Sequence, residues 1–435
     1  MTQDGFLAQA AEGKPAAAGA RLHRPARAKS VIVLFMQGGV SHVDTFDPKP
    51  ELNRRHQQAS PEKSDPGAQE KTGKLFGSPW KFAPHGQSGI EVSELFPHVA
   101  RRVDDLAIIR GMRTDTAAHA AAGLQMNTGF MRNGFPSVGS WISYGLGRAN
   151  DNLPSYIVLN ASGLGQIGGS ANWGAGFMPA EHQGVPFGGG PAPVANLRSL
   201  KGADAADQRG QLDLLARFNQ LHLDQQADNT ELAARIASYE LAFRMQTSAP
   251  DAVDLSQESD ETRVLYGLPK SGFGQSCLLA RRLVERGVRF VQLYLGGWDS
   301  HQGLKDSYER NGAACDQPIA GLLTDLKRRG LFETTLVVWT SEFGRTPHAQ
   351  GNGRDHHARG FTTWLAGGGV KGGIVHGATD ELGYAAVEKP VHVHDLHATI
   401  LHLLGIDHEK LTYRHASRDY RLTDVHGHVV QDILA

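Results

Sequence analysis

The chain has 435 residues, with 44 lysines and arginines against 45 aspartates and glutamates, so its formal net charge is −1. This balance excludes a global basic field that would attract nucleic acid, and no apolar run approaches the ~20 residues that span a membrane. Cys277 and Cys315 belong to no paired motif, and they say little about the redox compartment.

The beginning of the chain is rich in alanine and glycine and carries several arginines. It has no continuous apolar segment, so no signal peptide is expected. We expect residues 1–29 to form a flexible lead-in. A single α/β domain would follow over residues 30–435, with an insertion at about 161–260.

The pattern of apolar residues alternates between strands and helices along the chain. β-branched and apolar runs predict buried strands at 30–36, 106–110, 155–160, 289–295, 335–339 and 361–365. Helical periodicity is expected at 99–105, 114–129, 138–144, 205–246, 272–287, 316–329 and 391–404, and a surface loop at 51–90. Asp115 or Thr116 would be the N-cap of the second of these helices. The alternation predicts a mainly parallel sheet covered by helices on both faces.

Between residues 161 and 197 the composition changes to glycine-rich, with scattered aromatic residues. A glycine-rich segment of this length in a compact enzyme is typically functional or disordered. Two interpretations stay open: a cap over a substrate site, or a plain surface loop.

Acidic residues and histidines follow three of the predicted strands. The first cluster contributes Asp44, the second Asp299 and His301, and the third Glu342, His356 and His357. Carboxylates and imidazoles at the carboxyl ends of strands suit a divalent metal, with zinc favoured and calcium, manganese or magnesium as alternatives. A single acid after a strand is more often a helix cap or an ion-pair partner, and it is the threefold repetition that predicts a metal site. Asp355 would orient a ligand histidine.

Further polar residues lie close to these clusters in the sequence. Arg345 and Arg354 could hold a tetrahedral oxyanion, or they could be ordinary ion-pair arginines. Thr116 could offer a hydroxyl to an anion at a helix start, or it could simply cap that helix. His119 could be a ligand, an acid or a structural helix residue.

Four separated motifs carry a resemblance to a known family. They are Phe35-Met-Gln-Gly-Gly-Val-Ser-His-Val-Asp-Thr-Phe-Asp-Pro48, Gly297-Trp-Asp-Ser-His301, Ser341-Glu-Phe-Gly-Arg-Thr-Pro347 and Gly353-Arg-Asp-His-His357. From about residue 28 to the end, the chain resembles a sulfatase-like bacterial family known as domain-of-unknown-function family 1501, in the alkaline phosphatase superfamily. The resemblance implies a three-layer sandwich with a central, mainly parallel sheet and a metal centre at its carboxyl edge.

The resemblance also suggests roles for individual residues. Asp44 would match the metal acid after the first strand, Asp299 and His301 the middle pair, Glu342 the late acid, and His356 or His357 the last histidine ligand. Thr116 would match the nucleophile of alkaline phosphatases. Relatives are commonly exported, which suggests a periplasmic or exported location that the chain itself does not indicate.

One departure narrows the expected chemistry. Formylglycine sulfatases need a Cys/Ser-x-Pro-x-Arg motif, and neither cysteine of this chain lies in one. We therefore expect a metal-dependent hydrolase of phosphate or sulfate esters that is not of the formylglycine type, acting on a small-molecule or glycan ester. The alternative is a non-catalytic relative that binds a glycan or a protein partner. The oligomeric state is left open.

Overall fold

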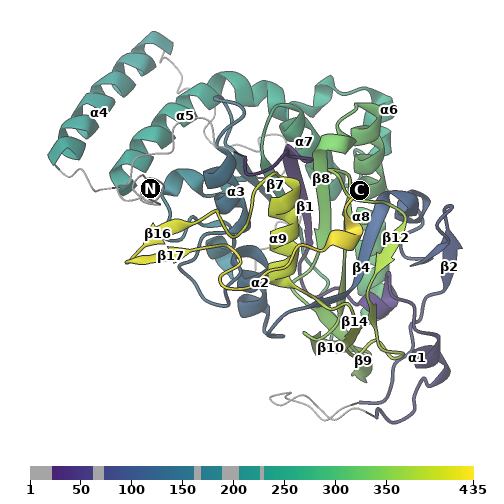
Figure 1. Ribbon diagram of the computed structural model, residues 1–435. Helices are drawn as coiled ribbons and strands as arrows, with labels where there is room; N and C mark the ends of the chain where they lie inside the picture. Colours follow the sequence, from purple (N-terminus) through teal and green to yellow (C-terminus); the bar gives the residue numbers. More distant parts are fainter. Residues whose placement is uncertain (1–21, 62–72, 161–167, 189–204, 226–229) are drawn as a thin grey trace.

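The computed structural model describes residues 22–61, 73–160, 168–188, 205–225 and 230–435 (Figure 1). Within these ranges the chain forms a large sheet with helices on both faces, four two-stranded sheets and several 3-10 helices. The predicted architecture, a mainly parallel central sheet flanked by helices, is confirmed. None of the described helices is both long and apolar enough to cross a membrane.

The large sheet has the strand order β12-β4-β11-β8-β1-β7-β5-β6, and β15 pairs with β4. Its strands are β1 (Ser30–Met36), β4 (Leu106–Arg113), β5 (Tyr156–Asn160), β6 (Val185–Phe187), β7 (Phe290–Leu295), β8 (Thr335–Thr340), β11 (Phe361–Ala366), β12 (Ile374–His376) and β15 (Val391–His392). The pairs β1–β7, β1–β8, β5–β7, β5–β6, β12–β4 and β15–β4 are parallel, and β11 runs antiparallel to both of its neighbours.

The central strand β1 shows why the sheet is buried on both faces. All of its residues are buried, as expected for a parallel strand that reads as one continuous apolar run. Alternate side chains enter two different cores, with Ile32 and Leu34 in one and Val31 and Val33 in the other. The first core contains side chains of α5, α7 and α8, and the second contains side chains of α2, α3 and α9. These are the two outer layers of the sandwich.

The α-helices are α1 (Pro50–Arg54), α2 (His119–Thr128), α3 (Val138–Leu146), α4 (Ala205–Gln225), α5 (Thr230–Val253), α6 (Asp260–Leu265), α7 (Gly272–Glu285), α8 (Leu304–Arg328) and α9 (Val393–Leu403). The 3-10 helices are η1 (His42–Asp44), η2 (Val99–Asp105), η3 (Gly169–Trp173), η4 (Ala180–His182), η5 (Leu255–Gln257), η6 (Phe332–Thr334) and η7 (Gln431–Ile433). The two-stranded sheets are β2 (Phe82–His85) with β3 (Ile90–Ser93), β9 (Gly344–Gln350) with β10 (Gly353–His357), β13 (Ala378–Thr379) with β14 (Ala386–Glu388), and β16 (Tyr413–His415) with β17 (Arg418–Tyr420).

Several predicted boundaries are wrong. The predicted helix at 99–105 is present with these bounds, as the 3-10 helix η2, but the segment 51–90 contains most of α1, β2 and the start of β3 rather than loop alone. Helix α8 begins twelve residues before the predicted start at 316, because its first half carries charged residues that blur the apolar period. The predicted helix at 391–404 begins instead as the short strand β15.

The described part of the N-terminal lead-in is fixed to the domain. The backbone N–H groups of Arg27 and Ala28 donate to the Leu403 carbonyl at 2.8 and 2.9 Å. Residues 1–21 lie outside the described part, as do 161–167, 189–204 and 226–229 within the proposed insertion. The division into a lead-in, a domain and an insertion at about 161–260 therefore stays a prediction.

Candidate metal centre

Four side chains from three segments of the chain converge beyond the carboxyl end of β7. Asp299 and His301 lie between β7 and α8, His119 is the first residue of α2, and His356 belongs to β10. Asp299 Oδ1 lies 3.0 Å from His301 Nε2 and 3.3 Å from His356 Nε2, and its Oδ2 lies 3.3 Å from His119 Nε2. The Nε2 atoms of His301 and His356 are 2.9 Å apart. The ligand atoms of His119, Asp299 and His356 are close enough together to share one metal ion, and His301, Asp355 and His356 form a second group that overlaps with it.

The other nitrogen of each imidazole ring is held by an acceptor. His119 Nδ1 lies 2.6 Å from Glu342 Oε1, and His356 Nδ1 lies 3.0 Å from the Ala117 carbonyl oxygen. His301 Nδ1 contacts Oε1 of Gln350. An acceptor at Nδ1 places the proton of a neutral ring on that atom and leaves the Nε2 lone pair free. All three lone pairs are then directed toward Asp299, as in histidines that bind a metal.

The side chains present fit a metal ion. The Nε2 atom of His119 is buried and has no hydrogen-bond partner of acceptable geometry, although Asp299 lies next to it. The Asp299 side chain is 41% exposed, so the centre is open to an additional ligand from solvent. Three imidazoles and one carboxylate form a ligand set that suits zinc better than calcium or magnesium, because calcium and magnesium favour ligand sets made only of oxygen atoms.

The ionisable groups of the centre shift one another's pKa values. Burial acts to lower the pKa of His119, but the neighbouring carboxylates of Asp299 and Glu342 outweigh it and raise that pKa to about 9. Partial burial acts to raise the pKa of Asp299, but the neighbouring side chains of His119, His356 and Arg345 hold it far below its usual range. Burial lowers the pKa of His356. Because a metal and a proton compete for the same lone pair, a metal bound here displaces a proton from His119.

Glu342 lies beside this group of ligands and makes a different set of contacts. Its carboxylate accepts hydrogen bonds from the backbone N–H of Gly38 at 2.9 and 3.1 Å and from the Ser341 hydroxyl at 3.1 Å, in addition to its contact with His119. Its position two residues after β8 brings it to the site as the sequence predicted. Its contacts are those of a residue that orients His119.

The structure does not bring Asp44 to the centre. Its carboxylate is fully buried and accepts from the Arg354 guanidinium at 2.7 and 3.1 Å and from the Ser41 hydroxyl at 2.6 Å. These partners occupy both oxygens. Arg354 therefore belongs to a buried ion pair, which is the second of the two alternatives that the sequence left open for it.

His356 and His357 point in different directions. Both lie in β10, where successive side chains point to opposite faces of the strand. His356 reaches Asp299, whereas the Nε2 atom of the buried His357 contacts the Tyr384 carbonyl oxygen. Burial lowers the pKa of His357 to about 3. A register shift between Arg354 and His356 keeps Asp355 near the centre, with its Oδ1 3.8 Å from His301 Nδ1.

Arg345 is fully buried and positions Asp299. Its guanidinium donates to Asp299 Oδ1 at 2.6 Å and to the backbone carbonyls of Gly38, Gly39 and Arg354. With most of its donors used by these acceptors, Arg345 has little capacity left for a substrate oxyanion. Of the two roles that the sequence left open for Arg345, the ion pair agrees better with these contacts than the binding of an oxyanion.

Thr116 does not cap α2, and neither does Asp115, so that prediction is wrong. The N-cap is Ala118, and the Thr116 hydroxyl oxygen accepts from the Ala118 N–H at 3.2 Å within the turn before the helix. The Ala117 carbonyl next to it binds His356. Thr116 is half-buried and lies three residues before His119, and its role as a nucleophile stays a prediction.

Some contacts of the centre carried no sequence signal. Gln350 pairs with Gly353 across the β9–β10 hairpin, and no motif marks it as a partner of His301. The cysteines lie away from this chemistry, because both are buried in the first core among side chains of α7 and α8.

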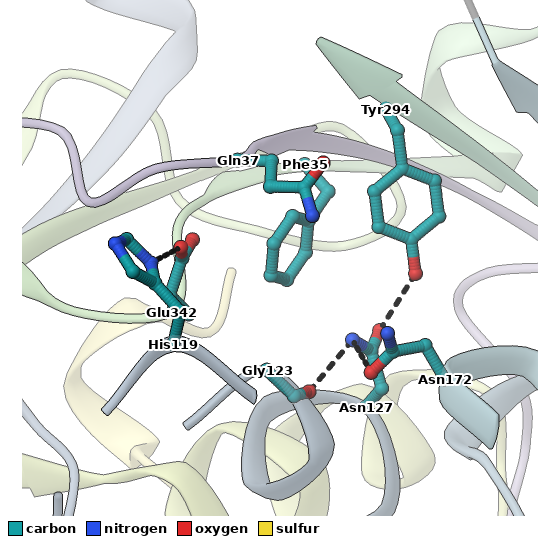
Figure 2. A pocket seen from close by; sticks show the side chains of 8 residues that line it. All are labelled: Phe35, Gln37, His119, Gly123, Asn127, Asn172, Tyr294 and Glu342. Atoms are coloured by element: carbon teal, nitrogen blue, oxygen red, sulfur yellow. Dashed lines mark hydrogen bonds and ion pairs between the residues drawn. The ribbon is translucent and has the colours of Figure 1, made fainter. Parts of the chain in front are cut away.

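A pocket lies beside the metal-ligand group (Figure 2). His119 and Glu342 form one side of it, and Asn127 and Asn172 lie opposite, with their amides hydrogen-bonded at 3.2 Å. The remaining lining residues are Phe35, Gln37, Gly123 and Tyr294. Asn172 belongs to η3, so the described part of the glycine-rich segment reaches this pocket.

Comparison with protein families gives one match. The family described as "Protein of unknown function (DUF1501)" matches residues 28–434. The chain belongs to this family. The resemblance noted in the four sequence motifs is thereby confirmed, and it extends over nearly the whole described domain. No curated protein matches the chain in sequence.

Solved structures of similar shape are distant in sequence. A PsFucS1 sulfatase from Pseudoalteromonas sp. has 12% identity and a TM-score of 0.38, covering 89% of this chain and 69% of its own. The alkaline phosphatase of the Antarctic bacterium TAB5 has 10% identity and a TM-score of 0.35, covering 87% and 98%. The lipoteichoic acid synthase LtaP from Listeria monocytogenes has 9% identity and a TM-score of 0.34, covering 90% and 76%. Likenesses this weak carry no argument about activity.

Proposed function

We propose that this DUF1501 protein is a metal-dependent hydrolase of phosphate or sulfate esters. The observation that carries the proposal is that three imidazole Nε2 atoms lie within 3.3 Å of the Asp299 carboxylate oxygens, with the Nδ1 of every ring held by an acceptor. Neutral lone pairs directed at one another and at a carboxylate repel unless a cation or protons lie between them. A divalent metal resolves this repulsion.

The proposed ligands are His119, Asp299, His301 and His356, and the proposed metal is zinc. This set differs from the sequence prediction because it includes His119, leaves out Asp44 and His357, and gives Glu342 an orienting role. When bound, the metal would act as a Lewis acid toward an ester oxygen and lower the pKa of a hydroxyl or water. The exposed side of Asp299 leaves room for the substrate to approach.

The residues around the centre hold its geometry. Arg345 fixes Asp299 through a 2.6 Å contact and is itself held by backbone carbonyls, so the carboxylate keeps its position when solvent or substrate enters. Glu342 fixes the ring of His119 in the same way. We propose Thr116 as the nucleophile, since its hydroxyl lies one residue before the Ala117 carbonyl that orients His356. Within the described residues no free arginine lies at the centre, so the metal would supply most of the positive charge that an oxyanion needs.

Metal analysis tests the first half of the proposal. Protein purified without chelators should contain about one zinc per chain, or bind one when zinc is added after dialysis against a chelator. Asp299→Ala and His301→Ala should each lower zinc affinity by about a hundredfold or more, as expected when a ligand is removed. His222→Ala, on the exposed surface of α4, is the matched control. Wild-type protein that binds no zinc, manganese or nickel contradicts the proposal.

Turnover tests the second half. The zinc-loaded protein is assayed with 4-nitrophenyl phosphate, bis(4-nitrophenyl) phosphate and 4-nitrophenyl sulfate, with the metal-free protein as the blank. We expect hydrolysis of at least one of these esters, and its loss in Asp299→Ala. Bound metal without turnover on the whole panel would instead favour the non-catalytic, ligand-binding alternative.

A further inference from the structure

Helix α4 carries its largest apolar side chains on a face that is turned toward solvent. Leu214, Phe218 and Leu221 are 56%, 61% and 61% exposed, and Leu215 is 37% exposed. Their spacing of three and four residues places them on one side of the helix, where they form a single apolar stripe. A surface helix of a globular protein normally turns such a stripe toward its own core. In α4 the stripe points away from the part of the chain that the structure describes.

The opposite face of α4 is attached to α5 mainly through charged groups. The Arg209 guanidinium donates to the Glu240 carboxylate of α5 at 2.7 and 3.0 Å, and it lies 5.1 Å from the centroid of the Phe243 ring. Arg209 also pairs with Asp213, one turn further along α4, at 2.6 Å. None of the described side chains of α4 belongs to an apolar core. Figure 1 shows α4 at the upper left, beside α5 and apart from the sheet.

This attachment gives α4 little stability of its own. Isolated helices of about 20 residues are marginally stable in water, and helices in proteins gain most of their stability from packing an apolar face. The stripe supplies little of that stability while it faces water. A partner that covers the stripe would stabilise α4 and remove apolar surface from water.

The charges beside the stripe restrict the kind of partner that fits. Asp207, Asp213 and Arg217 are exposed on α4, so the helix has no excess of positive charge. Helices that bind anionic membranes carry lysines and arginines beside their apolar stripe. The stripe itself is uncharged and offers no ion pair to a strongly charged protein. A second uncharged apolar stripe is the surface that matches it.

The arrangement of the stripe allows a second copy of α4 to cover it. Phe218 lies near its centre, with Leu214 and Leu215 before it and Leu221 after it. In two antiparallel copies related by a twofold axis near Phe218, the first leucines of each stripe pack on Leu221 of the other copy. At roughly 100 Å² each, the four side chains of one chain expose on the order of 400 Å². Two stripes with their polar neighbours would bury about 1,000 Å², the size that a specific interface needs.

We propose that this protein forms a symmetric dimer in which the stripe of α4, Leu214, Leu215, Phe218 and Leu221, packs antiparallel on the same stripe of a second copy. Because the interface is at the small end for a specific complex, the dimer should dissociate in the micromolar range. The described side chains of α4 take no part in the metal centre. The inference is therefore independent of the proposed function.

Sedimentation velocity of the full chain tests the proposal. Between roughly 1 and 200 μM, wild type should shift from monomer to dimer. Phe218→Glu would place two carboxylates at the twofold axis and should raise the dissociation constant about a hundredfold or more. Val264→Glu, at a position that is 63% exposed on α6, is the matched control and should dimerise as wild type does. Circular dichroism checks that both variants fold.

Two results of this experiment overturn the proposal. Wild type that stays monomeric over the whole range shows that the stripe does not pair with a second copy. If that monomer co-sediments with vesicles of phosphatidylcholine and phosphatidylglycerol, the stripe instead binds a lipid surface. A dimer that Phe218→Glu leaves intact places the interface elsewhere on the molecule.

A thiol at the centre of the stripe tests the antiparallel geometry. Both native cysteines are buried, so the thiol introduced by Phe218→Cys would be the accessible one. With oxidised glutathione, this variant should form a disulfide between two chains, because the two copies of position 218 meet at the axis. Val264→Cys should remain a single chain on a non-reducing gel. Equal cross-linking of the two variants, or none in Phe218→Cys, contradicts the proposed packing.

Discussion

Glu342 Oε1 lies 2.6 Å from Nδ1 of His119, while Nε2 of the same ring is directed at Asp299. Glu342 thus acts on the metal centre through His119. The carboxylate is itself fixed by the Gly38 backbone and by Ser341, so it is a rigid acceptor rather than a mobile ligand. An acid of this kind sets the tautomer and the direction of the imidazole and makes the ring a stronger donor to a metal.

This arrangement predicts that a substitution of Glu342 weakens zinc binding less than a substitution of a proposed metal ligand. Glu342→Gln removes the charge and keeps an acceptor, so zinc affinity should fall by about 10–100-fold, the usual cost of a changed partner behind a ligand. Asp299→Ala, which removes a proposed ligand, should cost more. Competition titration with a fluorescent zinc chelator measures both. If Glu342→Gln loses as much affinity as Asp299→Ala, Glu342 is itself a ligand.

The neighbouring histidines of β10 provide a matched pair. His356→Ala should lower zinc affinity by about a hundredfold or more, because it removes a ligand atom next to Asp299. His357→Ala should keep the metal and lower the free energy of unfolding by about 1–3 kcal/mol, since it removes the buried contact between the imidazole and the Tyr384 carbonyl. Zinc titration and urea unfolding of the two variants separate the effects. Equal loss of zinc in both variants contradicts the opposite orientation of the two side chains.

The Asp44–Arg354 pair should be important for stability and not for metal binding. Asp44→Asn leaves the fully buried Arg354 cation without its counter-charge, at a cost of about 3–5 kcal/mol. The double variant Asp44→Leu/Arg354→Met removes both charges and should recover much of that loss. Denaturant unfolding of the metal-free proteins measures the cost, and zinc affinity should stay within about threefold of wild type in both variants. A hundredfold loss of zinc affinity in folded Asp44→Asn would return Asp44 to the metal ligands.

His397 should make the protein less stable in acid. Burial lowers its pKa to about 3, while its Nε2 contacts the Met126 carbonyl at 2.9 Å. In the unfolded chain its pKa is about 6.5, so below that pH the unfolded chain binds a proton that the folded protein does not. The contribution of His397 to the free energy of unfolding is constant above pH 6.5. Below that pH it decreases as the pH falls toward 3, so the protein becomes less stable.

The measurement for His397 is urea unfolding at pH 7 and pH 5 in the presence of a chelator, which keeps metal release out of the comparison. Wild type should lose about 2 kcal/mol more than His397→Gln between these two pH values. His222→Gln, at an exposed position on α4, should follow wild type. An identical pH dependence of wild type and His397→Gln would show that His397 accepts a proton in the folded state.

Substitutions at Thr116 test the proposed nucleophile without removing a proposed metal ligand. Thr116→Val keeps the shape of the side chain and removes its hydroxyl, so turnover should fall by roughly a thousandfold or more while zinc content stays unchanged. Thr116→Ser should keep turnover within about tenfold of wild type, since the hydroxyl remains. The preferred 4-nitrophenyl ester is the substrate for both measurements. Wild-type turnover in Thr116→Val would leave a water molecule as the nucleophile.

The sequence by itself determined the layers of the fold. The continuous apolar run at 30–36 becomes β1 with the same boundaries, and the alternation of strands and helices gives the mainly parallel sheet. It also placed Asp299, His301 and Glu342 at strand ends, because local periodicity and strand propensity decide where a strand stops. The carboxyl ends of parallel strands then bring such residues to one edge of the sheet.

Only the tertiary structure decided which of these side chains share a site. Asp44 is paired with Arg354, 310 residues later in the chain, and the β9–β10 hairpin turns His356 toward Asp299 and His357 away from it. No motif marked Gln350, and only the β9–β10 hairpin places it beside His301. The direction of a lone pair depends on contacts between distant segments, and local sequence patterns do not contain that information.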